Sequence, residues 1–394
     1  MFGTFVRFKC CPQGAAIRSC PTSSQSGKKV KRILLVGGGT AGHVEPALAV
    51  GNWLLVKSSD IACEFVGTKS GIENELVPLA GLKLHHILKA PLPRSITPST
   101  LLWPIKFAIS ISQALKIVKS ADLVIGFGGY VSAPCYLAAK ISGVPLIIHE
   151  ANAIPGWANK LGARFADEIL VAFKSSLKEG GKWASAKLVG MPIREEIFAI
   201  SNMSKSDRSG IWDATYRELG LDRSKRTIFI FGGSLGAQTI NNVVERTLPE
   251  LLKLDINIIH GIGRGNTLPK AVPGYVPLSY ISNMAAMYIA SDLIISRGGA
   301  VTCAELDLSN AFALIIPLPI GNGEQVANAQ DLVAKGAAEI CLSSDFTPNW
   351  LLENIGLLIS KADSWNIKKS QTITTPSAAI IGEIVLKNLA GSLK

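Results

Sequence analysis

Four glycine-rich turns contain most of the residues that could bind or react with a phosphorylated substrate. They span residues 37–42, 126–129, 232–236 and 298–299. Glycine lets the backbone approach a phosphate, and the N-terminus of a following helix offers free N–H groups and the positive end of a dipole. The first turn leads into His43, a residue type that suits proton transfer near neutral pH. The sequence therefore predicts phosphate binding in both halves of the chain and a candidate general base in the first half.

Short apolar runs precede these turns and predict buried strands. The runs are residues 31–36, 121–125, 227–231 and 291–295, and further runs follow at 144–149 and 312–317. Continuous Val, Ile and Leu runs separated by helical patterns are typical of parallel sheets covered on both faces. The predicted fold class is therefore α/β, with two Rossmann-like parallel-sheet domains facing each other across a cleft.

The repeated pattern divides the chain into four parts. Residues 1–29 form a basic leader, residues 30–195 a first Rossmann-like domain, residues 196–225 a polar linker, and residues 226–394 a second Rossmann-like domain. An amphipathic stretch at 378–389 predicts a final helix. Its pattern does not indicate which domain it packs on.

The leader is basic and contains no acidic residue. Its cations are Arg7, Lys9, Arg18, Lys28 and Lys29, and the first acid of the chain is Glu45. An acid-poor, Ser-containing basic leader is typical of an organelle transit peptide. The alternative is a disordered basic tail of a bacterial protein.

Composition narrows the kinds of partner. The 394 residues carry a formal net charge of +11, which favours an anionic partner such as a phosphorylated substrate or a lipid surface. No RNA- or DNA-binding motif accompanies the charge, so we expect no nucleic acid. The 7 cysteines are scattered and match neither a disulfide framework nor a metal site. No stretch of about 20 residues is apolar enough to suggest a membrane span.

The first turn also matches a dinucleotide fingerprint, with glycines at Gly37, Gly39 and Gly42. That fingerprint needs an acid at the end of the second strand. Glu64 lies in the middle of the apolar run 62–66, and no acid ends it. An NAD(P)-dependent oxidoreductase is therefore the competing enzyme class, and a non-catalytic binding protein is a third.

Longer motifs resemble a known enzyme family. They are GGGTAGHV at 37–44, GFGGYVSAP at 126–134, HEAN at 149–152, VGMPIR at 189–194, GGSLGAQ at 232–238, RGGAVTCAE at 297–305, and Glu324-Gln325 with Asn328. In this order they resemble the MurG family of peptidoglycan N-acetylglucosaminyltransferases, over roughly residues 30 to 390. The chain departs from the family's pattern at Glu45, Ala151, Gly298, Ala304 and Glu324.

The resemblance implies a GT-B fold and an inverting reaction that uses no metal or other cofactor. GlcNAc would pass from UDP-GlcNAc to the MurNAc 4-hydroxyl of lipid I, a polyprenyl-diphosphate-linked acceptor, to give lipid II. A related UDP-sugar transferase acting on another lipid, as plastid galactolipid synthases do, is the alternative within glycosyltransferases.

The resemblance also assigns roles to single residues. His43 is the candidate base. The implied donor contacts are Thr40, Ala41, Gly42, Asn152, Arg194, Ser234, Ile281, Ala300, Val301, Thr302, Cys303, Ala304, Glu305 and Gln325. Among these, Glu305 would accept the ribose hydroxyls and Arg194 would offset charge on the leaving UDP. From the residues alone, Glu305 could instead pair with a helix dipole, and Arg194 could be a surface cation.

Acceptor and membrane contacts are implied in the N-terminal half. By resemblance, Gly39, Gly128, Gly129 and Tyr130 would bind the acceptor diphosphate. Between Pro91 and Ile111, apolar residues that begin at Leu101 are accompanied by the basic residues Arg94 and Lys106, a pattern that suits an anionic membrane surface or a buried amphipathic helix. We expect a peripheral membrane protein, in the chloroplast if residues 1–29 are a transit peptide and otherwise on the cytoplasmic face of the bacterial inner membrane.

Overall fold

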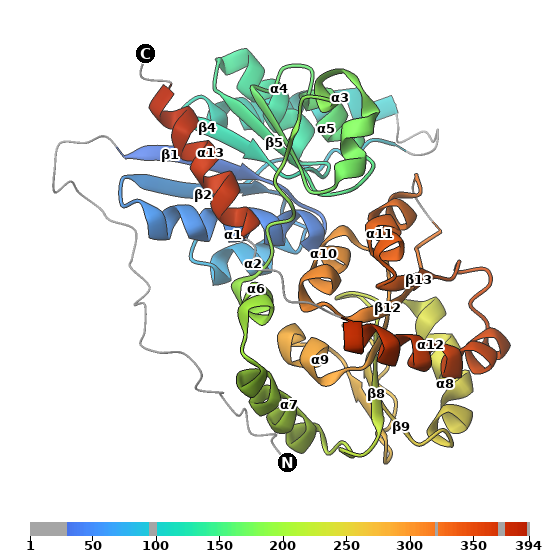
Figure 1. Cartoon of the computed structure of the whole chain (residues 1–394). Coiled ribbons are helices and arrows are strands. Elements are labelled where there is room, and N and C mark those ends of the chain that lie inside the picture. Colours follow the sequence, from blue (N-terminus) through green and yellow to red (C-terminus); the bar gives the residue numbers. More distant parts are fainter. Residues whose placement is uncertain (1–29, 94–100, 320–321, 369–374, 392–394) are drawn as a thin grey trace, which may run out of the picture.

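Two α/β domains make up the computed structural model, which describes residues 30–93, 101–319, 322–368 and 375–391 (Figure 1). Each domain is built on one parallel sheet, of seven strands in the first and six in the second. The predicted leader, residues 1–29, lies outside the described residues. Within the described part of the chain, no helix has the length and apolar character needed to cross a membrane.

The N-terminal sheet has its topological switch point between β1 and β4. In spatial order its strands are β3 (Lys83–His86), β2 (Ile61–Gly67), β1 (Lys31–Val36), β4 (Leu123–Gly126), β5 (Leu146–Glu150), β6 (Glu168–Val171) and β7 (Lys187–Leu188). Val36 and Gly126, the last residues of β1 and β4, are partners in register. The turns that follow these strands therefore lie side by side at the carboxyl edge of the sheet, where open α/β sheets bind ligands.

The C-terminal sheet repeats this arrangement. Its spatial order is β10 (Tyr275–Leu278), β9 (Ile256–Gly261), β8 (Arg226–Phe231), β11 (Leu293–Ser296), β12 (Phe312–Ile315) and β13 (Ala338–Ile340). Phe231 and Ser296 are partners at the ends of β8 and β11. The third and fourth glycine turns therefore also meet at a switch point.

Helices cover both faces of each sheet, which explains the continuous apolar strands. In β1, Ile33 and Leu35 belong to one core cluster, whereas Leu34 and Val36 belong to another. The helices are α1 (Ala41–Lys57), α2 (Glu73–Leu79), α3 (Trp103–Val118), α4 (Ser132–Ser142), α5 (Trp157–Gly162), α6 (Glu195–Asn202), α7 (Lys205–Leu219), α8 (Gln238–Leu252), α9 (Met284–Ala290), α10 (Ala300–Ser309), α11 (Glu324–Lys335), α12 (Pro348–Lys368) and α13 (Ser377–Gly391), with 3-10 turns η2 (Lys174–Glu179) and η3 (Gly181–Trp183). The predicted α/β class with two parallel sheets is confirmed.

The predicted linker, residues 196–225, is largely helical. It contains most of α6 and all of α7, and Ser204 caps α7 by accepting a hydrogen bond from the Asp207 N–H at 3.1 Å. Ile197 and Tyr216 are buried in the same core cluster as Phe229 of β8. The segment is therefore part of the C-terminal domain's packing, although its polar outer face suggested a free connection.

The final helix, α13, packs on the N-terminal domain. Its buried residues Ile381 and Val385 share a core cluster with Ile33 and Leu35 of β1, and Figure 1 shows α13 lying against α1. The predicted assignment of residues 226–394 to the second domain is therefore wrong for this helix. An amphipathic pattern gives the buried face of a helix but not its partner, so only the tertiary structure identifies α1 as the surface it covers.

Gly382 allows α13 to approach α1, which gives a test. A Cβ at Gly382 would lie 2.1 Å from the Trp53 ring, whereas one at Gly391 would meet no atom within 4 Å. We expect Gly382→Leu to lower the free energy of unfolding by about 1–3 kcal/mol, the usual cost of overpacking. Gly391→Leu is the matched control and should stay within about 0.5 kcal/mol of wild type. Urea unfolding measures both, and equal stability of the two variants would contradict this packing.

Candidate functional site

His43 is held as a neutral imidazole at the start of α1. Its Nδ1 lies 2.9 Å from the carbonyl oxygen of Phe127, in the second glycine turn. A carbonyl oxygen can only accept, so Nδ1 carries the proton and Nε2 is left as an acceptor. Burial lowers the pKa of His43, and the hydrogen bond to Phe127 only partly opposes this. The imidazole is therefore neutral at pH 7 with Nε2 ready to take a proton.

The second glycine turn packs directly against this histidine. Gly128 and Gly129 have φ of +89° and +85°, in the left-handed region that favours glycine. A Cβ at Gly129 would lie 2.4 Å from the Gly38 carbonyl oxygen and 3.2 Å from the His43 ring. Any larger residue would push the two turns apart, so the glycines bring these predicted residues together around His43.

A buried carboxylate fixes the first turn from behind. Glu73 is fully buried and accepts hydrogen bonds from Gly39 N–H at 3.2 Å and from Thr68 N–H at 2.9 Å. Tyr130 OH lies 3.2 Å from Thr68 Oγ1, and Lys89 Nζ lies 5.3 Å from the centre of the Tyr130 ring. The N–H of Gly39, which was predicted to bind an acceptor diphosphate, is therefore already engaged by Glu73.

A second buried carboxylate shapes the loop that carries Asn152. Glu150 accepts hydrogen bonds from Asn152 N–H at 2.8 Å, Gly156 N–H at 3.0 Å and Asn159 Nδ2 at 2.9 Å. Burial raises the pKa of Glu150, while these bonds oppose the rise. Neighbouring His149 donates from Nε2 to the Gly190 carbonyl at 3.0 Å, and its buried Nδ1 has no hydrogen-bond partner within the described chain. Glu150 of the HEAN motif thus fixes the conformation of the loop that follows it.

In the C-terminal domain, the third and fourth turns enclose a cavity of about 410 Å³. It contains the predicted residues Thr302 and Gln325, and the side-chain Oε1 of Gln325 accepts a hydrogen bond from Leu318 N–H at 2.9 Å. Arg297, to which the sequence had assigned no role, also lines it. The cavity lies at the sheet's switch point, and the N-termini of α8 and α10 begin beside it.

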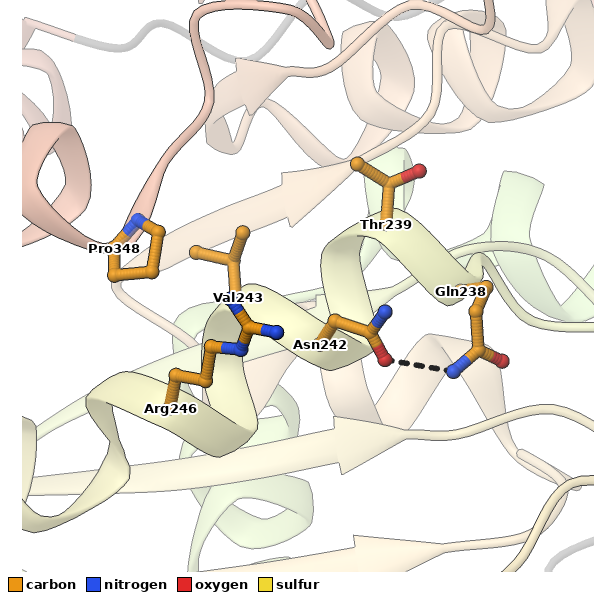
Figure 2. Close-up of a pocket in the computed structure, with 6 residues that line it drawn as sticks. All are labelled: Gln238, Thr239, Asn242, Val243, Arg246 and Pro348. Carbon is orange, nitrogen blue, oxygen red and sulfur yellow. Dashed lines mark hydrogen bonds between the residues drawn. The ribbon is translucent and has the colours of Figure 1, made fainter.

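A second hollow, with a volume of about 250 Å³, lies along α8 (Figure 2) and shares Gln238 and Thr239 with the first cavity. It is lined by Gln238, Thr239, Asn242, Val243, Arg246 and Pro348. Gln238 donates to Asn242 Oδ1 at 2.7 Å. This hollow contains none of the predicted site residues and no glycine turn, so the glycine-lined cavity is the better candidate for phosphate binding.

Asn328 of α11 connects the two halves of the site. Its Oδ1 accepts a hydrogen bond from Ala153 N–H at 2.8 Å, and its Nδ2 donates to Asn152 Oδ1 at 3.3 Å and to the Gly298 carbonyl at 3.1 Å. The side chain is buried. One amide therefore links the HEAN loop of the first domain to the fourth glycine turn of the second.

Both carboxylate oxygens of Glu305 accept hydrogen bonds from other side chains. Glu305 is the sixth residue of α10, whose first turn contains no acid, so the alternative of dipole pairing at the helix N-terminus is wrong. Its Oε1 accepts from Arg194 Nη2 at 3.2 Å and its Oε2 from Tyr288 OH at 2.8 Å. The residue is only 3% exposed, so a ribose could reach the carboxylate only after Arg194 or Tyr288 moves. Burial raises the pKa of Glu305, against the opposing effect of Arg194.

Arg194 is surrounded by carboxylates. Burial lowers the pKa of Arg194, but Glu305, Glu45 and Glu196 together outweigh that effect and the net shift is upward. Burial raises the pKa of Glu45, a departure from the family pattern, and Arg194 opposes this rise. Arg194 is thus no free surface cation, and its charge is already offset before any diphosphate binds.

The remaining predicted residues lie around these groups. Thr40 is the N-cap residue of α1, and Ala41 and Gly42 begin that helix. The Ser234 carbonyl accepts a hydrogen bond from Arg264 N–H at 3.0 Å, and Ile281 lies beside Gly261 at the end of β9. Ala300, Val301, Cys303 and Ala304 are residues of α10. Cys303 is buried, and burial raises the pKa of its thiol to about 12.

A second link crosses between the domains at the surface. Arg264 Nη1 lies 2.8 Å and 2.9 Å from the two carboxylate oxygens of Glu75 in α2. The guanidinium also lies over the Tyr280 ring, 4.0 Å from its centre. Both ionic side chains are about half exposed, so the pair contributes only about 0–1 kcal/mol.

Arg297, Tyr288 and Glu73 are among the residues of the site that had no individual predicted role. Arg297 had a signal, because a charged residue directly follows the buried strand β11 and precedes two glycines. Tyr288 and Glu73 act through contacts with residues distant in sequence, and their local sequence gives no sign of this. No group of three or more His, Cys, Asp or Glu side chains that could hold a metal ion occurs in the part of the chain described.

Solved structures share this architecture. A crystal structure of *Acinetobacter baumannii* MurG is similar with a TM-score of 0.68 and 28% identity, over 91% of this chain and 99% of that one. A UDP-GlcNAc 2-epimerase from *Neisseria meningitidis* has a TM-score of 0.61 at 16% identity, over 90% of this chain and 100% of that one, which shows the fold alone. The two facing parallel-sheet domains thus define a GT-B fold, as predicted.

Sequence comparison then identifies the family. Models of the glycosyltransferase family 28 N-terminal and C-terminal domains match residues 33–171 and 227–384. The chain belongs to glycosyltransferase family 28, which confirms the predicted family and gives no support to an NAD(P)-dependent oxidoreductase.

Bacterial relatives match over nearly their whole length. One from *Corynebacterium glutamicum* is 39% identical over 367 residues, 92% of this chain and 99% of the relative. One from *Streptomyces avermitilis* is 39% identical over 330 residues, 82% of this chain and 88% of the relative. Both are named UDP-N-acetylglucosamine–N-acetylmuramyl-(pentapeptide) pyrophosphoryl-undecaprenol N-acetylglucosamine transferase.

His43 and His149 should be opposite tautomers. We expect ¹⁵N NMR of histidine-labelled protein at pH 7 to show His43 protonated at Nδ1 and His149 protonated at Nε2, because each ring donates to a carbonyl from that nitrogen. Both histidines should titrate below the ordinary value of about 6.5, because burial lowers the pKa of His43 and lowers that of His149 to about 4. His43→Gln and His149→Gln assign the signals. An imidazolium signal from His43 at pH 7 would contradict this geometry.

Proposed function

We propose that the protein transfers GlcNAc from UDP-GlcNAc to the MurNAc 4-hydroxyl of lipid I, releasing UDP and forming lipid II. The observation that carries the proposal is His43, whose Nε2 is kept unprotonated by the Nδ1 bond to Phe127 where two glycine turns meet. Family membership and the shared name of the bacterial relatives support the same reaction. No observation on this chain favours the galactolipid-synthase alternative.

The proposed reaction is a direct displacement at the sugar carbon. The acceptor 4-hydroxyl oxygen bonds to C1 of GlcNAc while the bond from C1 to the β-phosphate oxygen breaks, and that electron pair leaves with UDP. The hydroxyl proton passes to Nε2 of His43, so the imidazole acts as general base. Attack from the face opposite the leaving group inverts the configuration at C1. The chain's own residues supply the base and the phosphate cradle, and the proposal requires no metal or cofactor.

We assign the donor to the C-terminal cavity and the acceptor to the N-terminal turns. Thr302 and Gln325 line the donor cavity, and Asn328 holds Asn152 of the first domain beside it. Because Gly39 N–H is engaged by Glu73, the acceptor diphosphate in this proposal is bound mainly by the second turn and Tyr130, with Lys89 nearby as a cation.

We further propose that α3 rests on an anionic membrane. Leu101 and Ile105 are 79% and 59% exposed, and Leu102, Ile109 and Lys106 are exposed beside them. A buried amphipathic helix would not leave so many apolar side chains in solvent, whereas an interfacial one would. The protein would then be peripheral to the membrane that contains its lipid acceptor, in a chloroplast if residues 1–29 are a transit peptide and otherwise at the bacterial inner membrane.

Loss of the base should abolish transfer but not donor binding. We expect His43→Ala to lower kcat for UDP release with a soluble lipid I analogue by about 10²–10⁴-fold, the usual contribution of a general base. His86→Ala, which changes an exposed histidine at the end of β3, is the control and should be unchanged. The wild-type rate should fall as pH drops through the lowered pKa of His43, because protonation occupies Nε2. Acceptor-dependent release that survives in His43→Ala would contradict the proposed base.

Membrane binding gives an independent test. We expect the double variant Leu102→Glu/Ile105→Glu to bind vesicles containing phosphatidylglycerol at least about tenfold more weakly than wild type, since each apolar side chain contributes about 1.5–3 kcal/mol when fully buried. Leu357→Glu replaces a leucine of α12 that is 55% exposed and serves as the matched control. Co-sedimentation measures binding. Equal loss in the double variant and the control, or none in either, would argue against α3 as the contact.

A further inference from the structure

Arg297 is a buried cation at the wall of the C-terminal cavity. It follows β11 directly and is 9% exposed. Its Nη1 donates to the carbonyls of Ile316 at 3.0 Å and Pro317 at 3.1 Å, and to Ser343 Oγ at 2.6 Å. Two carbonyls that directly follow β12 and one hydroxyl that follows β13 therefore hold one corner of the guanidinium in place.

The rest of this guanidinium has no partner among the residues that the structure describes. Among the described residues, neither Nε nor Nη2 of Arg297 has a hydrogen-bond partner, and no carboxylate lies within 4.0 Å of it. Burying a cation without a counter-charge is costly, and burial lowers the pKa of Arg297 accordingly. Arg194 differs, because Glu305 already binds it at 3.2 Å.

The surroundings of Arg297 favour a dianionic ligand. The cavity of about 410 Å³ is also lined by Gly232, Gly233 and Gly236 of the third turn. The N-termini of α8 and α10 begin at this cavity, and neither helix has an acidic residue in its first turn. The electrostatic potential in the cavity is therefore positive. The guanidinium, the N–H groups at the two helix N-termini and the two helix dipoles all contribute to it.

We propose that Arg297 contacts the diphosphate of the sugar donor and stabilises UDP as it leaves, the role that the resemblance had assigned to Arg194. This inference rests on the proposed function. When the bond from C1 to the β-phosphate oxygen breaks, the electron pair stays on that oxygen, and Nε and Nη2 of Arg297 donate hydrogen bonds to the phosphate that carries it. Charge that develops during the step makes the contact stronger in the transition state than in the bound substrate.

Calorimetric binding of UDP and of uridine to the full chain tests the assignment. We expect Arg297→Gln to weaken UDP about 10- to 100-fold, as for loss of hydrogen bonds to a charged group, and to leave uridine unchanged. Ser343→Ala is the matched control, because it removes one anchor of the same guanidinium and keeps the charge. It should bind UDP within about threefold of wild type. In the transfer assay Arg297→Gln should lower kcat more than it raises KM.

The outcomes separate this inference from the proposed function. If wild type binds no UDP, both fail. If wild type binds UDP and Arg297→Gln binds it equally well, the donor proposal stands and the role of Arg297 is wrong. If Arg297→Gln loses uridine as well, or Ser343→Ala loses UDP to the same extent, Arg297 only supports the fold of the loop and the inference is overturned.

Discussion

The buried amide of Asn328 is the interaction on which the alignment of the site depends. The candidate base lies on one sheet and the phosphate cavity on another, and each is fixed only relative to its own domain. Asn328 satisfies the backbone N–H of Ala153, the side chain of Asn152 and the carbonyl of Gly298 at once. A buried amide with fixed donor and acceptor sides tolerates little change in the position of these groups. This buried contact, together with the Arg264–Glu75 and Arg194–Glu305 pairs, therefore holds the two carboxyl edges facing each other.

Local sequence was sufficient to predict the framework of the site. The apolar runs of β1 and β8 alternate between core clusters on both faces of their sheets, and this double burial produces the continuous pattern from which parallel strands were predicted. The glycine turns could also be predicted from local sequence, because Gly128 and Gly129 have backbone angles that other residues rarely adopt. The order of the sequence motifs along the chain then indicated the glycosyltransferase family. Each of these features depends on residues close together in the chain.

The features that sequence missed depend on partners far apart in the chain. Nothing near Arg194 indicates that Glu305, 111 residues later, neutralises it. Nothing near Arg297 indicates that its partners in the described part of the chain are the Ile316 and Pro317 carbonyls and Ser343. A charge-balance argument needs every neighbour of a cation, so the two arginines could not be distinguished before the structure. The same limit explains α13, whose apolar face fits α1 but carries no local sign of it.

A crystal structure with UDP-GlcNAc bound would test the central claim, that one cleft joins a C-terminal donor cavity to His43 of the first domain. The account predicts the diphosphate between Arg297 and the third glycine turn, and C1 of GlcNAc facing Nε2 of His43 with room for an acceptor hydroxyl between them. It would be contradicted by UDP-GlcNAc bound in the hollow along α8, or by a sugar whose C1 faces away from His43.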